Sequence, residues 1–431
     1  MSNYQAIIAK IDRTIPIDGA DNIKIAVVLS EFVIVSKSYV DGMVGVFFPA
    51  GTQLSESFCR ENNLYRDKEQ NKDNTKSGFI EKNRKIRAQP FMKVKSEGLF
   101  MSLDALSFTG AKLTDLRVGD KFEKLNNIDI ATKFISEKTK NAGAANKQKA
   151  VKKNLTPLFH EHMDTGQLKH NITKIEVGDL ITIQTKKHGT SVRYANTKHQ
   201  LALPKWKKFV NKFFDVFPTE KFDFVVGTRR VVLNTPEKTG FHGSEAYRFV
   251  WLEKLKPFLT QGMTVYGELV GFANGKPIMN PHNLDSLKNK ALLKKYGKEP
   301  MVYKYGCPNG TCDFHIYRIT VTTNDGLTID LSQKQLVTWC ELRGFKPSHD
   351  LVEPFFYDGN ADALLELVET LTEREDVLCE DVHDASHISE GVIIRVDRGG
   401  FNPLFLKNKS FYFKCLEGIA QENEVDEEDA S

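Results

Sequence analysis

Short β-forming runs fill the first 130 residues of the chain, and they limit what this part can fold into. The runs are separated by glycine, aspartate and proline and occupy residues 23–40, 41–51, 80–103 and 116–125. Many short strands broken by turn residues are typical of a small barrel or sandwich. We therefore predict a β-rich module over residues 1–130.

Residues 157–418 mix helical and strand patterns. Apolar residues recur with helical spacing at 204–217 and 244–259. Strand patterns occupy 263–273, 312–323, 390–397 and 409–415. The fold class predicted for the whole chain is therefore α+β. The segments around 197–225 and 355–385 have no assignable role.

Charge is unevenly distributed along the chain, although its net value is only +4. Residues 131–156 are rich in lysine and lack apolar periodicity, which predicts a basic linker. Residues 419–431 are acidic and predict a disordered tail. A basic patch on a near-neutral chain fits a polyanionic partner and equally fits a solvated surface.

Several protein classes are disfavoured by composition. No run of about 18 apolar residues occurs, which excludes a transmembrane helix, and the first 20 residues lack a signal-peptide pattern. Six scattered cysteines, without a second Cys/His pair at zinc spacing, favour a reducing compartment. We expect a cytoplasmic protein without a membrane partner, and no feature requires an oligomer.

The stretch 181–196 places two lysines, Lys186 and Lys187, and then His188-Gly189-Thr190-Ser191, at the end of a strand pattern. A lysine amine is a nucleophile only when deprotonated, which requires burial or neighbouring cations. A glycine lets the backbone approach a ligand closely. The pattern predicts a phosphate or nucleotide pocket, and a lysine-capped surface turn remains the alternative.

The Lys-x-His-Gly-Thr-Ser pattern resembles the first motif of the covalent nucleotidyltransferase superfamily, which contains ligases and capping enzymes. Four further segments resemble the later motifs of that superfamily in the same order: 265–271, 314–320, 389–397 and 406–414. The histidine at the third motif position is similar to the RNA ligase branch. Residues 80–103 and 301–319 also resemble an RNA ligase family with members in Deinococcus and Naegleria. The resemblance therefore covers nearly the whole chain.

This resemblance implies a fold, a reaction and a set of roles. The fold is an N-terminal OB-fold barrel at 1–130, a linker at 131–156 and a nucleotidyltransferase domain of antiparallel sheets flanked by helices at 157–418. The reaction seals RNA 3′-OH and 5′-phosphate ends with ATP and Mg²⁺ or Mn²⁺, through lysine-AMP and RNA-adenylate. The implied catalytic residues are Lys186 as nucleophile, Glu390 as the metal-linked carboxylate, and Lys407 and Lys409 as phosphate contacts.

Nucleotide and RNA contacts are implied less specifically. Glu268 is expected to bind the ribose, and Tyr317, with Phe314 as the alternative, to stack on adenine. Phosphate contacts are expected from Ser191 and Arg193. His188 is expected either to orient a metal-bound water at the nucleotide or to hydrogen-bond the backbone, and a purely structural role is equally open. RNA contacts are expected from Arg229 and Arg230, and in the N-terminal module from Lys82, Arg84, Lys85 and Arg87. The segment 158–168 is expected to line the nucleotide pocket rather than to bind a metal.

Other members of the superfamily are the main alternatives. DNA ligases and capping guanylyltransferases usually have a C-terminal OB domain, and only 22 residues follow Lys409 here. That arrangement favours an RNA ligase, whose expected substrate is a nicked duplex. A ligase fold without activity that only binds nucleic acid is the third possibility.

Overall fold

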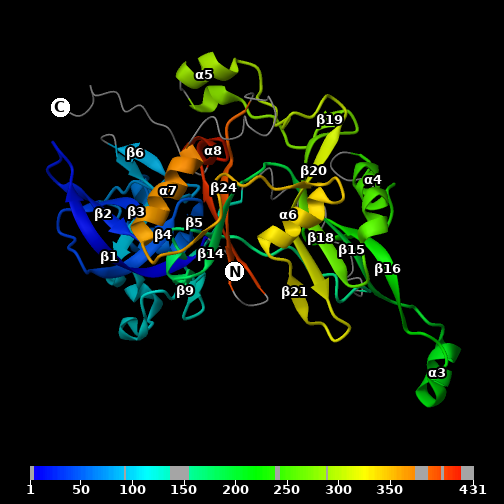
Figure 1. Cartoon of the computed structure of the whole chain (residues 1–431). Helices are drawn as coiled ribbons and strands as arrows, with labels where there is room; N and C mark the ends of the chain where they lie inside the picture. The colour runs from blue at the N-terminus through cyan, green and yellow to red at the C-terminus, as the bar shows by residue number, and fades with distance from the viewer. Residues whose placement is uncertain are drawn as a thin grey trace. The chain divides into compact units, whose positions relative to one another are not determined.

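The computed structural model describes residues 4–91, 94–135, 155–237, 243–287, 290–373, 387–398 and 402–418. These residues belong to two compact units, which we treat separately (Figure 1). The first unit takes the chain up to residue 148, with residues 284–291 and the segment from 411 onward. The second unit takes residues 149–283 and 292–410.

One antiparallel sheet, in the order β3-β2-β1-β4-β8 with β9 beside β1, forms the centre of the first unit. Its strands are β1 (Ala6–Pro16), β2 (Ile23–Val28), β3 (Glu31–Ser36), β4 (Val44–Pro49), β8 (Gly98–Ser102) and β9 (Lys121–Phe122). The amide of Glu97 donates to the carbonyl of Phe32 at 2.8 Å. This bond links the two outer strands, so the sheet is nearly closed.

Smaller elements complete the first unit. They are β5 (Thr52–Leu54), α1 (Glu56–Glu61), β6 (Gln89–Phe91), β7 (Val94–Ser96), β10 (Lys124–Leu125), β11 (Ile128–Asp129) and β12 (Ala131–Lys133). Strand β12 pairs with β5, so ordered structure extends past the boundary predicted at residue 130. The rest of the predicted linker, from 136 to 154, and the predicted tail lie outside the described residues.

The strand predicted at 409–415 is wrong beyond its first residue. The observed strand β25 (Leu404–Lys409) ends where the prediction begins, and helix α8 (Phe411–Leu416) follows it. Phe411, Phe413 and Cys415 are buried. Their alternate burial imitates a strand, and packing overrides the β preference of aromatic residues.

The second unit contains two sheets. The five-stranded sheet has the order β13-β25-β24-β14-β23, and the larger sheet has β17-β16-β15-β18-β20-β21, with β19 on β18 and β22 on β20. In the first sheet, the remaining bounds are β13 (Gly166–Gln167), β14 (Leu180–Thr185), β23 (Phe355–Phe356) and β24 (Gly391–Asp397). In the second they are β15 (Thr190–Gln200), β16 (Glu220–Gly227), β17 (Val232–Leu233), β18 (Met263–Ala273), β19 (Lys276–Pro277), β20 (Cys312–Thr322), β21 (Thr328–Asp330) and β22 (Lys346–Pro347).

Helices cover one face of each sheet. Helices α4 (Ala246–Leu255) and α6 (Gln333–Glu341) bury apolar side chains in one core with β15, β18 and β20. Helix α7 (Ala361–Glu373) packs on the five-stranded sheet. The remaining helices are α3 (Lys205–Phe214) and α5 (Lys290–Tyr296). The predictions are confirmed for two helices, α3 and α4, and for three strands, β18, β20 and β24.

Among the described residues, no helix combines the length and the apolar character needed to cross a lipid bilayer.

Candidate active site

A four-residue link, Lys186 to Gly189, connects the two sheets of the second unit. Strand β14 of the smaller sheet ends at Thr185, and β15 of the larger sheet begins at Thr190. The candidate nucleophile therefore lies where the two sheets meet, and a side chain there can face groups from both sheets.

Strand register explains why three distant motifs come together. Strand β24 runs antiparallel to both β14 and β25, so it begins where the other two end. Gly391 pairs with Lys409, and the Lys186 amide donates to the Gly391 carbonyl at 2.9 Å. The Cβ of any other residue at 391 would lie 2.1 Å from the Asn408 carbonyl oxygen, and φ is +132°. A glycine is thus required beside Glu390.

The carboxylate of Glu390 gathers three candidate catalytic groups. Its Oε1 lies 2.7 Å from Lys186 Nζ and 3.2 Å from Lys409 Nζ. Its Oε2 lies 3.5 Å from His188 Nδ1. Glu390 is buried, with 4% of its surface exposed. The structure therefore brings together four residues predicted from separate motifs.

The pKa shifts of Glu390 and Lys407 are consistent with this geometry. Burial alone raises the pKa of Glu390, but Lys186 and Lys409 outweigh it and hold the pKa below its usual value. Burial, together with the charges of Lys409 and Lys186, lowers the pKa of Lys407 to about 8. Lys407 is therefore part of the same cationic cluster and is partly neutral at slightly alkaline pH.

The larger sheet contributes a second row of polar side chains. Ser191 pairs with Glu268, and Glu268 pairs with His315, in adjacent strands. Ser191 Oγ donates to Glu268 Oε2 at 3.0 Å. A Cβ at Gly189 would lie 2.4 Å from the Leu269 carbonyl oxygen and 2.8 Å from Glu268 Cγ. Only glycine lets the link pass this close to the Glu268 side chain.

Glu268 titrates near neutrality. Burial raises its pKa to about 7 from the usual 4.5, although Lys186 and the bond from Ser191 act in the opposite direction. Above this pH the side chain is a carboxylate and accepts hydrogen bonds only.

We expect the Glu268→Gln variant to gain stability relative to the parent protein as pH rises. The folded protein holds the Glu268 proton up to about pH 7, whereas the unfolded chain releases it near 4.5. Folding stability from this group is therefore present below pH 4.5 and lost through pH 7. The Glu268 side chain is only partly shielded from water, which reduces the energetic effect of the pKa shift. We therefore expect the free energy of unfolding of the variant to exceed that of the parent protein by about 1–2 kcal/mol at pH 8. Urea unfolding of both proteins at pH 5 and pH 8 measures this difference in stability. The same difference at both pH values would contradict a raised pKa for Glu268.

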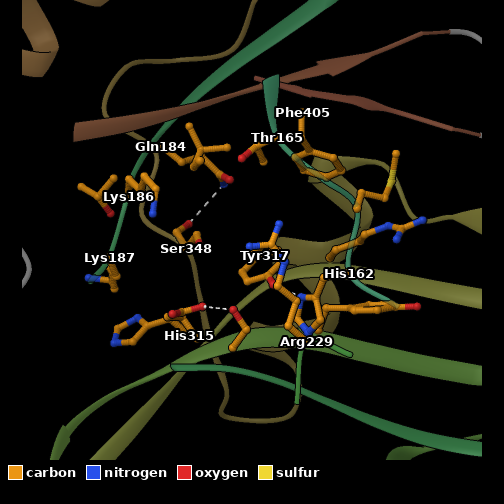
Figure 2. A pocket seen from close by; sticks show the side chains of 17 residues that line it. His162, Thr165, Gln184, Lys186, Lys187, Arg229, His315, Tyr317, Ser348 and Phe405 are labelled. Atoms are coloured by element: carbon orange, nitrogen blue, oxygen red, sulfur yellow. Dashed lines mark hydrogen bonds between the residues drawn. The ribbon is translucent and has the colours of Figure 1, made fainter. Parts of the chain in front are cut away.

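Lys186 from the link and Ser191, Glu268 and His315 from the larger sheet line a cavity of about 140 Å³, whereas Glu390, Lys407 and Lys409 are not among the described residues that line it. Figure 2 shows Lys186 and Lys187 on one side of it and Tyr317, His162 and Arg229 on the other. The lining residues are His162, Met163, Thr165, Gln184, Thr185, Lys186, Lys187, Ser191, Arg229, Tyr266, Glu268, His315, Tyr317, Arg318, Ser348, Ile393 and Phe405. Three residues of the segment 158–168 line this cavity: His162, Met163 and Thr165. Its role in nucleotide binding stays a prediction. Among the described residues, no group of three or more His, Cys, Asp or Glu side chains is placed to hold a metal ion.

Of the two candidate adenine-stacking residues, only Tyr317 faces the cavity. The register between β18 and β20 shifts between Tyr266 and Gly267, and this irregularity leaves Tyr317 without an opposite partner in the ladder. Its hydroxyl contacts His162 Nδ1. Phe314 is instead 1% exposed and packs edge-on against Tyr194 in the core.

His188 and Arg193 have mainly structural contacts. The His188 amide donates to the Tyr305 hydroxyl at 2.6 Å. Arg193 is 1% exposed, and its guanidinium donates to the carbonyls of Thr228 and Phe159 at 3.0 and 2.8 Å. Arg193 is not among the described residues that line the cavity.

The remaining predicted residues lie in two places. Arg229 lines the cavity and pairs with Asp164, while Arg230 is exposed and lies 4.0 Å from Glu161. In the first unit, Lys85 Nζ lies over the Phe134 ring, and burial lowers its pKa to about 8. Arg84, Lys82 and Arg87 are partly or fully exposed around it.

Two further residues position the site, and the sequence analysis did not identify them. Arg248, in α4, is buried and donates to Thr190 Oγ1 at 2.8 Å and to the Ser191 carbonyl at 3.2 Å. Arg248 Nε also donates to Glu245 Oε2 at 2.7 Å, which fixes the position of the guanidinium. Tyr305 binds the His188 amide. The one signal for Arg248 was a charged residue on the apolar face of a predicted helix.

The donor set suits a hard divalent cation that keeps most of its own water. Glu390 supplies one buried carboxylate beside the cavity. Magnesium is usually held by one or two carboxylates together with substrate phosphates and water. Glu390 would therefore hold such an ion, directly or through water.

No protein-family model matches the chain, and no curated protein matches it by sequence. Solved structures do match. A mutant of Naegleria gruberi RNA ligase with ATP and Mn aligns with a TM-score of 0.59 and 15% identity, over 96% of this chain and 99% of that one.

Two more structures of that protein agree. A second mutant with ATP and Mn has a TM-score of 0.58 and 16% identity, over 95% and 98% of the chains. The enzyme with PPi has a TM-score of 0.56 and 14% identity, over 95% and 98%. The chain therefore has the mixed α/β fold of the Naegleria gruberi RNA ligase.

Proposed function

We propose that the chain is an ATP-dependent RNA ligase that joins an RNA 3′-OH to an RNA 5′-phosphate. The observation that supports it most is the contact of Lys186 Nζ with Glu390 at 2.7 Å, beside Lys409, at a cavity between two sheets. The likeness in fold to an RNA ligase solved with ATP, AMP and PPi supports the same chemistry.

In the first step, the Lys186 amine attacks the α-phosphorus of ATP. A P–N bond forms, the bond to the β-phosphate breaks, and pyrophosphate leaves. Glu390 orients the amine, and Lys407 and Lys409 stabilise the charge on the phosphate oxygens. Alignment and charge neutralisation are the main requirements of phosphoryl transfer.

In the second step, an RNA 5′-phosphate oxygen attacks the same phosphorus and releases Lys186, which leaves an RNA-adenylate. In the third step, the RNA 3′-OH attacks the 5′-phosphorus and AMP leaves. A bound Mg²⁺ or Mn²⁺ supplies positive charge to the phosphate oxygens. Glu268, as a carboxylate, accepts hydrogen bonds from the ribose.

The first unit is proposed to be an OB-fold module that binds RNA. Its nearly closed sheet supports this assignment, since OB folds bind strands with a sheet face and loops. Lys82, Arg84, Lys85 and Arg87 are proposed as phosphate contacts, with Arg229 and Arg230 in the second unit. The proposed substrate is a nicked RNA duplex, and the proposed form is a cytoplasmic monomer.

Labelling with radioactive ATP or GTP tests the proposal. An RNA ligase forms a covalent AMP adduct with ATP, whereas a capping enzyme is labelled by GTP and an inactive binding protein by neither. Ligation of nicks with RNA or DNA on the 3′-OH side then separates an RNA ligase from a DNA ligase. Labelling by GTP alone, or sealing of DNA 3′ ends alone, would refute the proposal.

Tyr317→Ala is expected to raise the ATP concentration for half-maximal labelling by about 5- to 150-fold, the effect of losing one base–aromatic stack. Tyr317→Phe keeps the ring and should stay within about threefold of the parent protein. Phe314→Leu is the matched control, because a core residue should lower Tm instead of ATP affinity. An ATP effect for Phe314 and none for Tyr317 would reverse the assignment.

A further inference from the structure

Helix α3 exposes an apolar face. Trp206, Phe209, Phe213 and Phe214 are 58%, 63%, 65% and 75% exposed, and Val216 beyond the helix is 62% exposed. No residue of α3 is buried. Trp206, Phe209 and Phe213 are three and four positions apart, so they share one side of the helix. Most of each ring is open to a ligand.

Burial of its own side chains does not explain why this helix forms. It has ten residues, and isolated helices of that length are marginal in water. The Asn211 side chain makes two hydrogen bonds to the backbone of Phe217, which follows the helix, at 2.6 and 2.9 Å. Trp206 packs edge-on against the Phe217 ring. The fold thus fixes a surface that it does not itself cover, which marks a site of interaction.

The charge of α3 selects an anionic partner. The helix contains no aspartate or glutamate and four lysines: Lys205, Lys207, Lys208 and Lys212. The Lys207 amine lies over the rings of Trp206 and Phe217, so positive charge borders the aromatic face. The lysines of the adjoining strands have their charge balanced by nearby carboxylates: Lys198 pairs with Glu220, and Lys221 pairs with Asp223.

Strand β15 connects this helix to the cavity. It begins at Thr190, next to Ser191 on the cavity wall, and runs eleven residues to Gln200. Figure 1 shows α3 at the far end of the β15–β16 hairpin. At about 3.3 Å per residue the strand is roughly 33 Å long. That length matches about ten stacked nucleotides at roughly 3.4 Å each.

We propose that α3 binds an unpaired extension of one strand of the RNA substrate, beyond the nicked duplex and about ten nucleotides from the reacting ends. Bases stack on Trp206, Phe209 and Phe213, and the lysines contact phosphates. Stacking is sequence-tolerant because every base has a flat face. An anionic lipid surface shares part of this chemistry, but the strand that leads from the cavity to α3 favours RNA. This inference rests on the proposed RNA ligase function.

The test compares the full-length protein with the triple variant Trp206→Ala, Phe209→Ala and Phe213→Ala. Phe356→Ala is the matched control, because Phe356 is 72% exposed elsewhere in the same unit. The readouts are AMP labelling, affinity for unpaired RNAs of about 4 and about 16 nucleotides, and sedimentation with phosphatidylserine vesicles. All substituted side chains are more than half exposed. Because Trp206 also packs on Phe217, circular dichroism checks that the triple variant keeps its helix content.

AMP labelling should be unchanged in every variant, and its absence in the parent protein would refute the proposed function instead. The triple variant should bind the longer RNA at least about 10-fold more weakly and the shorter RNA equally well. Longer RNA should also quench Trp206 fluorescence, and Phe356→Ala should bind it normally. Unchanged affinity of the triple variant for the longer RNA overturns the inference. So does vesicle binding that depends on α3 while RNA binding does not.

Discussion

The Lys186→Ala variant is expected to form no detectable covalent AMP adduct, a loss of at least about 1,000-fold. Lys186 Nζ is the amine 2.7 Å from the buried Glu390 carboxylate, and it lines the cavity. Alanine removes the amine that bonds to the α-phosphorus in the proposed reaction. Incubation with labelled ATP and a divalent ion, followed by denaturing electrophoresis, measures the adduct.

Lys334→Ala is the matched control, because Lys334 is an exposed lysine of the same unit. It should label like the parent protein. The Lys186→Ala variant should still seal RNA that carries a preformed 5′-adenylate, since the third step does not use the amine. A Lys186→Ala protein that retains full labelling would remove the basis of the proposed mechanism.

Glu390→Gln is expected to lower both stability and activity. Its carboxylate lies between Lys186 and Lys409, whose charges depress its pKa. Removing one partner of a buried charge cluster costs about 3–5 kcal/mol. It also removes the oxygen ligand proposed for the metal. We expect AMP labelling to fall about 100- to 1,000-fold at a temperature where the variant remains folded.

A second substitution separates the two effects. Glu390→Gln combined with Lys409→Met removes one of the two cations left without their carboxylate partner, and it should restore part of the lost Tm without restoring labelling. Glu366→Gln, an exposed position on α7, should change neither quantity. Labelling that recovers in step with Tm would indicate that Glu390 only supports the fold.

Local patterns predicted strands β18, β20 and β24 of the site, but not β25 (Leu404–Lys409), which carries Lys407 and Lys409. Strand β18 occupies 263–273, as predicted from its apolar run. The same reasoning failed at α8, because Phe411, Phe413 and Cys415 are buried alternately on a helix of only six residues. Periodicity reports which positions are buried, and a short helix held by packing can share the strand pattern.

The candidate site was predictable as a set of residues but not as a geometry. Lys186, Glu390 and Lys409 were predicted from motifs, and their meeting depends on the register of β14, β24 and β25. Tyr317 was preferred to Phe314 from its motif position, but the register shift that leaves it without an opposite residue in the ladder is not revealed by a single sequence. Arg248 reaches the site through long-range contacts of α4 with β15, and its charge on an apolar helix face did not indicate which strand it would contact.

The most direct test of the central claim is peptide mapping of the AMP adduct formed from ATP. Mass spectrometry of a digest should locate one added AMP on Lys186, and acid should release it, as expected of a P–N bond. Lys187, the neighbouring amine on the cavity wall, should carry none. An adduct on Lys187 or on any other residue would contradict this account.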